Sequence, residues 1–364
     1  MNQEKAPAEC VHIQRKAVFV SAAAEEKVDA RNCFTVVSYN ILADCYIPSG
    51  CYPHVPVEKL KMTERHKQLI TELKFLDGDI VCLQEVDPHY YKDILFPFME
   101  KQGYQGVFLQ KIFGMEEGIA TFFKHGVFEL VEQKDVVLNS LFRDLINQDH
   151  LKEDDKNMLE NYFKKNSVLL ITKLKYMKTG KQVIVGNIHT WFGDWKNLDI
   201  ITIQIALATQ ELSRHKNGHD QSYMLCGDFN ATPEMPGYQF IQRGYLDEEY
   251  SRKMQLTPKL DLSFGSTTLA EALKQFLTHG LSDAKSAYKE VLGAEPAFTN
   301  YETFVGKYDL FVYCLDYIWY SSKSISVLGV LKTVSEEQVK PLVALPNTVF
   351  PSDHVSVKAW FTFC

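Results

Sequence analysis

Three runs of the sequence, residues 81–87, 226–230 and 350–354, place acidic, amide or imidazole side chains directly after apolar, strand-like stretches. Side chains at the ends of strands can converge on one point, and carboxylates that converge normally need a cation between them. Oxygen ligands suit Mg²⁺, or Mn²⁺, better than they suit Zn²⁺. The pattern therefore predicts an enzyme that hydrolyses phosphoesters with the help of a divalent cation.

The first two runs supply groups that suit this hydrolysis. Glu85 is a hard oxygen ligand after a strand, although one carboxylate at such a place is also typical of an exposed turn. Asp228 and Asn230 alternate around Phe229, so in an extended segment their side chains face the same side. Asp228 can then accept a proton from water while Asn230 donates to a phosphoryl oxygen. The alternative for these residues is an Asx turn before Pro233.

Two histidines and a further acid complete the candidate catalytic residues. His189 follows a strand of valine and isoleucine residues, where a single histidine is also typical of the core. Asp353 and His354 interrupt a run near the C-terminus that otherwise favours a strand, and Asp316 lies inside an apolar run. Because a buried acid needs a partner, we expect Asp316 to orient the imidazole of His354.

The composition allows this interpretation and excludes others. The 364 residues are 46% hydrophobic and 12% aromatic, enough for one large α/β domain with a sizeable core. The net charge of −7 excludes a generally basic nucleic-acid coat, so a nucleic-acid site would be a local patch helped by the charge of a bound metal. The eight cysteines form no CxxC pair, and Cys82, Cys226 and Cys314 are typical of buried thiols in a reducing compartment.

The N-terminal residues give no sign of export. Residues 1–9 contain glutamate, lysine and proline but no apolar signal-peptide core, and Glu4 and Glu9 are unusual in a mitochondrial presequence. No stretch approaches the apolar length that spans a bilayer. We therefore expect an intracellular protein, cytoplasmic or mitochondrial and not secreted, with no membrane partner.

Strand-like and helical segments alternate along most of the chain, as they do in an α/β domain built of layers. We expect helices at residues 64–76 and 199–212, where apolar residues recur at helical spacing. The expected strands are residues 17–20, 34–39, 80–83, 119–123, 168–173, 183–188, 223–226, 317–320 and 355–363.

Two segments differ from this alternation. Residues 140–166 are rich in charge with apolar residues at helical spacing, which predicts a helical insert at 139–166 lying on the layered domain. The polar composition of residues 247–266 predicts a loop. Because nothing marks a second folding unit, we expect an N-terminal extension at 1–32 and one catalytic domain at 33–364.

Six motifs, in their order, resemble the endonuclease/exonuclease/phosphatase superfamily and, within it, the deadenylase branch. The motifs are residues 38–44, 83–87, 187–189, 227–230, 315–318 and 351–354. The resemblance extends from Cys33 to the C-terminus. Finer features resemble the 2′,5′-phosphodiesterase most, among them Glu117 where most relatives have aspartate, the helical insert and residues 295–301. Residues 315–320 also resemble nocturnin, another member of the branch.

The resemblance implies an α/β fold, a two-sheet sandwich flanked by helices, with the active site at one end of the sheets. It implies a phosphodiesterase or 3′-exoribonuclease that cuts single-stranded RNA, an oligo- or polyadenylate with 2′,5′ or 3′,5′ linkages, and releases AMP. Asn40, Glu85 and Asp353 would surround one Mg²⁺, for which Mn²⁺ could substitute. Asp228 and Asn230 would activate water or hold a second cation.

The resemblance assigns His189 and His354 to the phosphoryl oxygens, with Asp316 orienting His354. The family's usual Asn-Thr-His-Leu is here Asn-Ile-His-Thr at residues 187–190, which keeps the histidine and loses one hydroxyl. Residues 191–199 depart from the relatives, so the family's substrate contacts do not carry over to this segment.

Four further residues are candidates for substrate binding. Asn187 lies two residues before His189 in the same motif, and Phe298, Tyr301 and Phe304 form an aromatic group before Asp316. Aromatic rings that stack on bases contribute about 1–3 kcal/mol per base, so one of these rings could hold an adenine. Ordinary core packing is the alternative for each of them.

Two other activities remain open. A phosphatase resembling nocturnin or the Angel proteins would act on a nucleotide 2′-phosphate or on a 2′,3′-cyclic phosphate. An inactive RNA-binding scaffold is the third possibility, although a scaffold has no chemical need for Glu85, Asp228 and His354 together.

Overall fold

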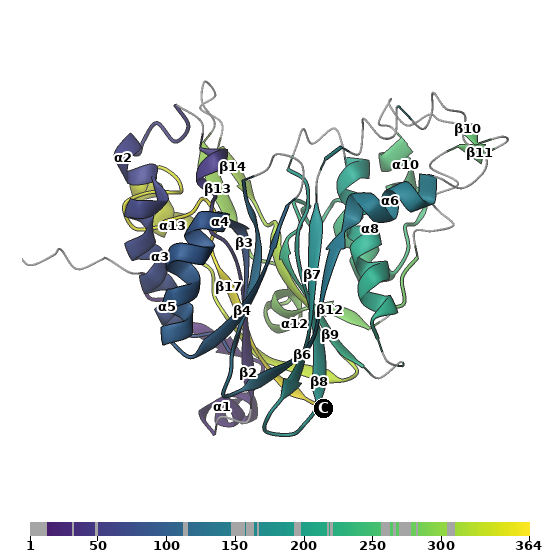
Figure 1. Cartoon of the computed structure of the whole chain (residues 1–364), viewed down its shortest axis with the longest axis horizontal. Coiled ribbons are helices and arrows are strands. Elements are labelled where there is room, and N and C mark those ends of the chain that lie inside the picture. The colour runs from purple at the N-terminus through teal and green to yellow at the C-terminus, as the bar shows by residue number, and fades with distance from the viewer. Residues whose placement is uncertain are drawn as a thin grey trace, which may run out of the picture.

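The computed structural model describes residues 13–364 except for 31–32, 48–49, 112–115, 147–156, 158–163, 166, 193–197, 217, 219–220, 256–262, 265–266, 269–277, 282 and 304–309. Two β-sheets pack face to face, and helices lie on the outer face of each sheet (Figure 1). The two-sheet α/β sandwich predicted from the sequence is therefore confirmed.

Hydrogen bonds divide the main strands into two sheets. The first sheet has the order β1 (Ala17–Phe19), β16 (Ile325–Leu331), β17 (Val357–Phe363), β2 (Phe34–Asn40), β3 (Ile80–Val86), β5 (Gly118–Lys124) and β4 (Tyr104–Gln110). The second has the order β12 (Ala284–Ser286), β15 (Asp316–Ser321), β9 (Ser222–Asp228), β8 (Gln182–His189), β7 (Val168–Tyr176) and β6 (Phe128–Val137). Two short ribbons pair β10 (Ser263–Phe264) with β11 (Thr267–Thr268) and β13 (Asn300–Thr303) with β14 (Leu310–Tyr313).

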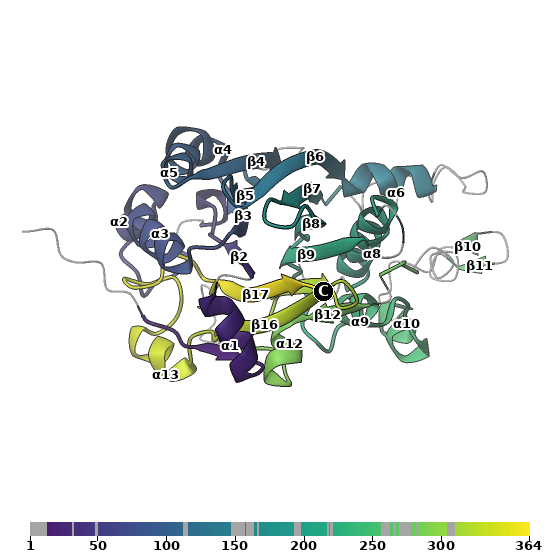
Figure 2. The ribbon, with the colours of Figure 1, turned by 90° about the horizontal axis from the view of Figure 1, so that it is seen from below.

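Helices cover the two outer faces. Figure 1 shows α3 (Met62–Leu76) and α5 (Phe96–Lys101) beside the first sheet and α8 (Leu198–Arg214) beside the second, and Figure 2 shows this arrangement from below. The other described α-helices are α1 (Ala22–Asp29), α2 (Val57–Leu60), α4 (Pro88–Tyr90), α6 (Leu138–Ile146), α9 (Pro236–Arg243), α10 (Glu248–Gln255), α12 (Ala287–Leu292) and α13 (Glu336–Val339). None of the helices in the described part of the chain has the length and apolar character needed to cross a bilayer.

Burial on both faces explains why the central strands are almost continuously apolar. In β3, Ile80 and Cys82 belong to the core between the sheets, whereas Val81 and Leu83 belong to the core under α3. Successive side chains of a strand point to opposite faces, so a strand covered on both sides needs apolar residues throughout. Each strand predicted from an apolar run lies in one of the two sheets, and the two predicted helices are α3 and α8.

Two pairs of parallel strands bring the candidate residues to one end of the molecule. β2 is parallel to β3, so Asn40 and Glu85 lie near the same sheet edge. β8 is parallel to β9, with His189 directly beside Asp228. β15 is antiparallel to β9 and begins with Asp316 opposite Asp228. Side chains that are distant in the sequence therefore meet because their strands end, or begin, at one edge.

The predicted boundary between an N-terminal extension and the domain at residue 33 is wrong. β1 pairs with β16 and adds an edge strand to the first sheet. Arg15 also forms an ion pair with Glu72 of α3 and donates hydrogen bonds to the carbonyl and the hydroxyl of Ser356. These contacts join residues at opposite ends of the chain, so local composition carries no sign of them.

The loop predicted at residues 247–266 is wrong in part, because α10 lies within it. Asp247 accepts a hydrogen bond from the amide of Tyr250, and Lys253 lies 3.0 Å from Glu249 one turn away. A short helix supported by a cap and a charge pair shows little apolar periodicity, so the sequence pattern did not reveal it. Residues 256–262 and 265–266 of this segment lie outside the described residues.

The predicted helical insert begins as expected. The helix α6 occupies its start, and Phe142 of this helix is buried in the core that α8 forms with the second sheet. Residues 147–156, 158–163 and 166 of the insert lie outside the described residues, so the rest of the predicted insert stays a prediction.

One buried arginine joins the loops that follow β2 and precede β17. Arg65 of α3 is 2% exposed, and its guanidinium donates to the carbonyl oxygens of Ile41 at 3.0 Å, Leu42 at 2.7 Å and Pro351 at 2.9 Å. The guanidinium also pairs with Asp44 at 2.7 Å. Since the first two carbonyls follow Asn40 and the third precedes Asp353, Arg65 fixes candidate ligands from the two ends of the chain relative to each other.

We predict that Arg65→Met lowers the free energy of unfolding by about 3 kcal/mol or more, because it leaves several buried carbonyls without a donor. Urea denaturation followed by circular dichroism measures this loss. Lys67→Met, on the exposed side of the same helix, is the matched control and should change stability by less than about 0.5 kcal/mol. Equal stability of the two variants would contradict the role given to Arg65.

Candidate active site

A β-bulge in β3 directs Glu85 into the site. The register with β5 shifts between Leu83 and Val86, and Glu85 has a φ of 56°, in the left-handed region that residues with side chains rarely adopt. Such a conformation costs about 1–3 kcal/mol and persists only where the surroundings fix it. Here the amide of Ala43 donates to Glu85 Oε2 at 2.9 Å and holds the carboxylate in place.

Asn40 bridges two carboxylates. Its Nδ2 donates to Glu85 Oε1 at 2.8 Å and to Asp228 Oδ2 at 2.9 Å, while its Oδ1 accepts a hydrogen bond from the amide of Leu42. Asn40 therefore turns its amide nitrogen toward the acids. Ligation of a cation by its oxygen, as the resemblance implies, would require the amide group to turn over.

A glycine permits the close approach of the strands that carry His189 and Asp228. Gly227 has a φ of 149°, and a Cβ atom on it would lie 1.9 Å from the carbonyl oxygen of Ile188. Glycine is required because any side chain at this position would collide with the neighbouring backbone. The approach places His189 Nε2 at 3.8 Å from Asp228 Oδ2 and at 3.8 Å from Glu85 Oε1.

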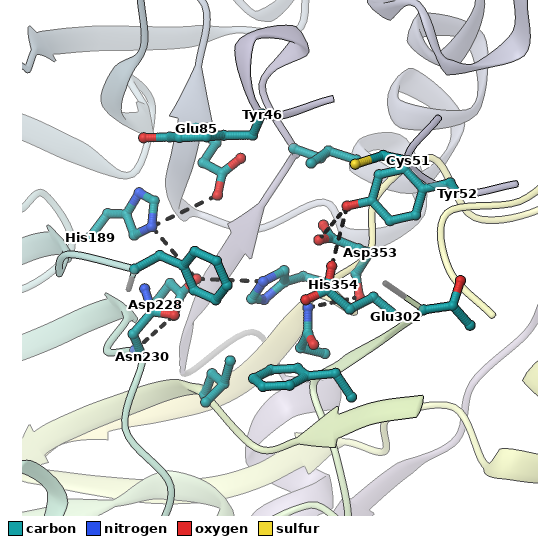
Figure 3. A pocket seen from close by; sticks show the side chains of 16 residues that line it. Tyr46, Cys51, Tyr52, Glu85, His189, Asp228, Asn230, Glu302, Asp353 and His354 are labelled. Atoms are coloured by element: carbon teal, nitrogen blue, oxygen red, sulfur yellow. Dashed lines mark hydrogen bonds and ion pairs between the residues drawn. The ribbon is translucent and has the colours of Figure 1, made fainter. Parts of the chain in front are cut away.

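His354 lies between two acids. Its Nδ1 is 2.7 Å from Asp316 Oδ2, and its Nε2 is 3.5 Å from Asp228 Oδ2. Burial alone lowers the pKa of His354, but the two carboxylates outweigh burial and hold this pKa well above its usual value. His354 is therefore a cation oriented by Asp316, in the arrangement expected from the sequence. Figure 3 shows His354 and His189 reaching toward Asp228 from two sides.

A neighbouring lysine keeps the imidazole of His189 neutral. Lys111 Nζ lies 3.1 Å from His189 Nδ1 and 2.6 Å from Glu117 Oε1, and Glu117 also accepts from the Tyr46 hydroxyl. Burial, with Lys111 and His354 nearby, holds the pKa of His189 well below its usual value. Because a lysine can only donate, His189 Nδ1 accepts and Nε2 carries the proton. This Nε2 is buried and has no hydrogen-bond partner among the described residues.

Asn230 enters the site through a turn. Its backbone amide donates to Asp228 Oδ1 at 2.9 Å, and its φ is 45°. This is the Asx turn that was the alternative, so the expected alternation in an extended segment is wrong. The side chain nevertheless lines the cavity, and its Nδ2 donates to the carbonyl of Thr190 at 3.2 Å.

Asp353 meets another acid on its side of the cavity. The Tyr52 hydroxyl lies 3.0 Å from Asp353 Oδ2 and 3.3 Å from Glu302 Oε2 (Figure 3). Burial and then the Asp353 carboxylate raise the pKa of Glu302 to about 9. At neutral pH this pair therefore retains a proton.

The carboxylates of Glu85 and Asp228 are buried without enough positive charge around them to balance their negative charge. Burial, then Asp353 and Glu117, raise the pKa of Glu85 to about 8. Burial raises the pKa of Asp228 to about 6, although His354 lowers it. Ligand atoms of Glu85, His189 and Asp228 lie within 4.8 Å of one another, so this group could hold a metal. A divalent cation fits the site because it would supply the positive charge that these hard oxygen atoms lack.

A cavity opens over these groups. Acids and histidines form its floor, with Glu85, Asp228, Asp353, Glu302, His189 and His354. Its walls include the aromatic residues Tyr46, Tyr52, Phe192 and Phe311. Among the described residues that line it, none is a lysine or an arginine. The cavity therefore suits a ligand that has a flat ring and brings little negative charge of its own.

The aromatic residues predicted to stack on a base lie elsewhere. Phe298 is 2% exposed and Tyr301 is fully buried, and their rings pack edge to face, 5.1 Å apart, in a small core with Val334 and Val355. Rings without exposed faces cannot stack on a ligand, so the substrate-binding prediction for both residues is wrong. Phe304, from the same group, lies outside the described residues.

Asn187 serves the interior of the sandwich. Its side chain is fully buried, accepts from Gln84 Nε2 at 2.8 Å, and donates to the carbonyl of Ala120 at 2.9 Å. These bonds tie the second sheet to two strands of the first. The predicted contact of Asn187 with the substrate is therefore wrong, because its amide group is already satisfied within the fold.

Sequence reasoning missed several residues of this site, Tyr46 and Tyr52 of the aromatic wall among them. Lys111 and Glu302 showed no motif of their own, and Phe192 lies in the segment that departs from the relatives. Phe311 is in an apolar run near Asp316 that is equally typical of a core strand. The one signal available was the charge of Lys111 and Glu302 in otherwise apolar surroundings, which predicts a buried partner but not its identity.

A family model and curated proteins match the chain. The model of the Endonuclease/Exonuclease/phosphatase family matches residues 37–354. Human 2′,5′-phosphodiesterase 12 is 32% identical over 91% of this chain and 52% of that protein. The CCR4-Not complex 3′-5′-exoribonuclease subunit Ccr4 of Yarrowia lipolytica is 30% identical over 91% of this chain and 48% of that protein. The chain thus spans about half the length of these curated relatives.

Solved structures of other proteins are similar to this chain over almost their whole length. ANGEL2, a 2′,3′-cyclic phosphatase solved in complex with adenosine-2′,3′-vanadate, superposes with a TM-score of 0.74 at 24% identity, covering 96% of this chain and 99% of that chain. The human Nocturnin catalytic domain with a bound sulfate anion superposes with a TM-score of 0.62 at 23% identity, covering 96% of this chain and 97% of that chain. At these identities the likeness shows a common fold.

We predict that Lys111→Met destabilises the fold by about 3 kcal/mol, because Glu117 then remains buried without its cation. The double variant Lys111→Met with Glu117→Gln should recover most of this loss, and thermal unfolding measures both. Loss of the lysine also frees His189 Nδ1, so ¹⁵N NMR of the imidazole should show a mixture of tautomers. An unchanged single tautomer in the double variant would contradict the role of Lys111.

Proposed function

Because this chain belongs to the endonuclease/exonuclease/phosphatase family, we propose that it is a metal-dependent phosphodiesterase of the deadenylase branch. Its substrate is single-stranded oligo- or polyadenylate with 2′,5′ or 3′,5′ linkages, and its product is AMP. The relatives named as a 2′,5′-phosphodiesterase and as 3′-5′-exoribonucleases support this reaction.

The observation that carries the proposal is the meeting of one carboxylate with two imidazoles in opposite states. Asp228 Oδ2 lies 3.5 Å from Nε2 of the cationic His354 and 3.8 Å from Nε2 of the neutral His189. Asp228 accepts the proton of the attacking water, while both imidazoles donate hydrogen bonds to phosphoryl oxygens, where negative charge grows in the transition state. Asn230 adds a further donor at the same edge of the cavity.

The proposed cofactor is Mg²⁺, with Mn²⁺ as a substitute. Glu85, Asp353 and Asp228 would hold it, with Asn40 and Asn230 beside them. The raised pKa values of Glu85 and Asp228 and the oxygen-rich group of side chains support a hard divalent cation here. When bound, the cation supplies neutralisation of the phosphoryl charge.

The charge of the cavity favours a phosphodiester over a terminal phosphate. A diester carries one negative charge, whereas a phosphomonoester carries nearly two at neutral pH. The lining contains four acids and, among its described residues, neither lysine nor arginine. Besides the proposed metal ion and His354, the described lining therefore offers no positive charge to balance a second negative charge on the ligand. Phe192, which is 46% exposed, and Phe311 offer rings on which a base can stack.

A 2′,3′-cyclic phosphate end is the second candidate substrate. It is also a diester with a single charge, and the fold likeness to ANGEL2, named as a 2′,3′-cyclic phosphatase, supports it. The same charge argument disfavours a nucleotide 2′-phosphate. The inactive scaffold is disfavoured because burying Glu85, Asp228 and His354 together raises the free energy of the fold without any benefit to a binding protein.

We also propose that the protein works in a reducing, intracellular compartment, either cytoplasmic or mitochondrial. The thiols of Cys82 and Cys226 lie in contact in the core between the two sheets, and the hydrogen bond between them, followed by burial, raises the pKa of Cys226 well above its usual value. Neighbouring buried thiols that serve as apolar packing are typical of proteins kept under reducing conditions.

Hydrolysis should require a divalent cation. Excess chelator should abolish AMP release, and Mg²⁺ or Mn²⁺ should restore it while thermal unfolding changes little. Glu85→Gln should raise the Mg²⁺ concentration needed for half-maximal activity by about tenfold or more, because a charged ligand becomes neutral. Full activity in excess chelator would contradict the metal dependence.

Asp228→Asn should lower kcat by about 10³-fold, because it removes the proton acceptor and keeps the shape. The assay uses the purified chain with Mg²⁺ against 2′,5′- and 3′,5′-linked oligoadenylates, a 2′,3′-cyclic phosphate end and NADP⁺, with the products separated. Release of AMP from an oligoadenylate supports the proposal, and release of phosphate from NADP⁺ alone would refute it. Stability that falls in step with activity would instead make Asp228 a structural residue.

Phe311→Ala should raise KM for oligoadenylate by about tenfold, since stacking of one base contributes about 1–3 kcal/mol. Hydrolysis of a small phosphodiester without a base should change little. Phe311→Tyr keeps the ring and is the matched control. Equal losses on both substrates would show that Phe311 supports the fold and does not hold a base.

A further inference from the structure

Glu302 is an acid of the cavity to which the proposed chemistry gives no role. It follows Tyr301 in β13, and because side chains alternate along a strand, Tyr301 enters the core while Glu302 faces the cavity. Glu302 is 7% exposed, and the Tyr52 hydroxyl, at 3.3 Å, makes a long hydrogen bond to it. A carboxyl group that is so buried gains from further donors, which a ligand with hydroxyl groups can supply.

The place of Glu302 in the cavity is defined on two sides. On one side the Tyr52 hydroxyl also lies 3.0 Å from Asp353, and the amide of Tyr301 donates to the carbonyl of Asp353, which ties β13 to this loop. On the other side Glu302 is the cross-strand partner of Phe311 in β14, so the two side chains share one face of the ribbon. Glu302 therefore lies between a candidate metal ligand and an aromatic wall.

This order matches the order of groups in a nucleotide. A phosphate held at Asp353 and His354 and a base stacked on Phe311 leave the sugar beside Glu302. We propose that Glu302 binds the free hydroxyl groups of the terminal ribose of the substrate, an inference that rests on the proposed function. The oxygens of a carboxyl group can accept hydrogen bonds from hydroxyls, and acidic residues bind ribose hydroxyls in this way in dinucleotide-binding proteins.

Such a contact makes the site selective for a particular chain end. A terminal ribose with free 2′- or 3′-hydroxyls donates to the carboxyl group, and removal of a hydroxyl removes a donor. A terminal phosphate would instead approach the pair of Glu302 and Asp353, which retains one proton and still carries one negative charge, and be repelled. Glu302 is thus a specificity residue that directs hydrolysis to a free hydroxyl end.

The experiment compares oligoadenylates that differ only in the last nucleotide, which ends in ribose, in a sugar without its free hydroxyls, or in a 3′-phosphate. With Mg²⁺, the kcat/KM of the wild type should be higher for the ribose end by about tenfold for each hydroxyl. The difference should come from a lower KM for the ribose end, with kcat nearly the same. Glu302→Ala should reduce this preference to about twofold and raise the relative rate on the 3′-phosphate end by about tenfold. Glu302→Gln, which keeps one acceptor oxygen and loses the other, should lie between them.

Two controls separate specificity from folding. Glu129→Ala removes an exposed acid of β6 and should keep the wild-type preference. If Glu302→Ala does not fold, Glu302→Met, which keeps the length and removes both acceptors, decides the matter. A wild type without preference for the ribose end, or a Glu302 variant with the wild-type preference, overturns this inference alone. Failure of the wild type to release AMP from any oligoadenylate overturns the proposed function and this inference with it.

Discussion

The rest of the structure is organised around two carboxylates, those of Glu85 and Asp228, that are buried within reach of the same amide group. Asn40 donates to both, at 2.8 and 2.9 Å, and burial raises the pKa of each acid. Placing such groups together in a low-dielectric interior is unfavourable unless donors and cations surround them. The backbone of Glu85 adds strain, with a φ of 56°. This unfavourable arrangement indicates that an exchangeable cation binds between the two acids.

The sandwich surrounds these two acids with donors and charged groups, because it brings strand ends from the whole chain to one edge. Two parallel strand pairs set Asn40 near Glu85 and His189 beside Asp228, and the guanidinium of Arg65 ties the loop after β2 to the loop before β17. The two histidines then acquire opposite states from their neighbours. His354 lies between acids, whereas a lysine donates to His189, so one imidazole is a cation and the other is neutral.

The cavity above these groups combines acids with aromatic walls, and this combination narrows the choice of ligand. Without lysine or arginine among its described lining residues, the site offers positive charge only through His354 and a bound cation. Flat rings at Phe192 and Phe311 provide surface for a base, and Glu302 provides acceptors between that surface and Asp353. A nucleotide joined through a singly charged diester matches these features in their spatial order.

The sequence by itself determined the layered α/β fold and those acids and histidines that lie at the ends of strands, because doubly buried strands must be apolar throughout and the polar residues that follow them stand out. Only the tertiary structure decided which neighbouring residues join that site. Tyr301 and Glu302 are adjacent, yet one packs in the core and the other faces the cavity, and this depends on how β13 pairs with β14 and on the loop that carries Asp353. Lys111 likewise acquires its role from His189, which lies on the other sheet. Pairing between distant segments leaves no local pattern in the sequence, since each partner alone is compatible with several environments.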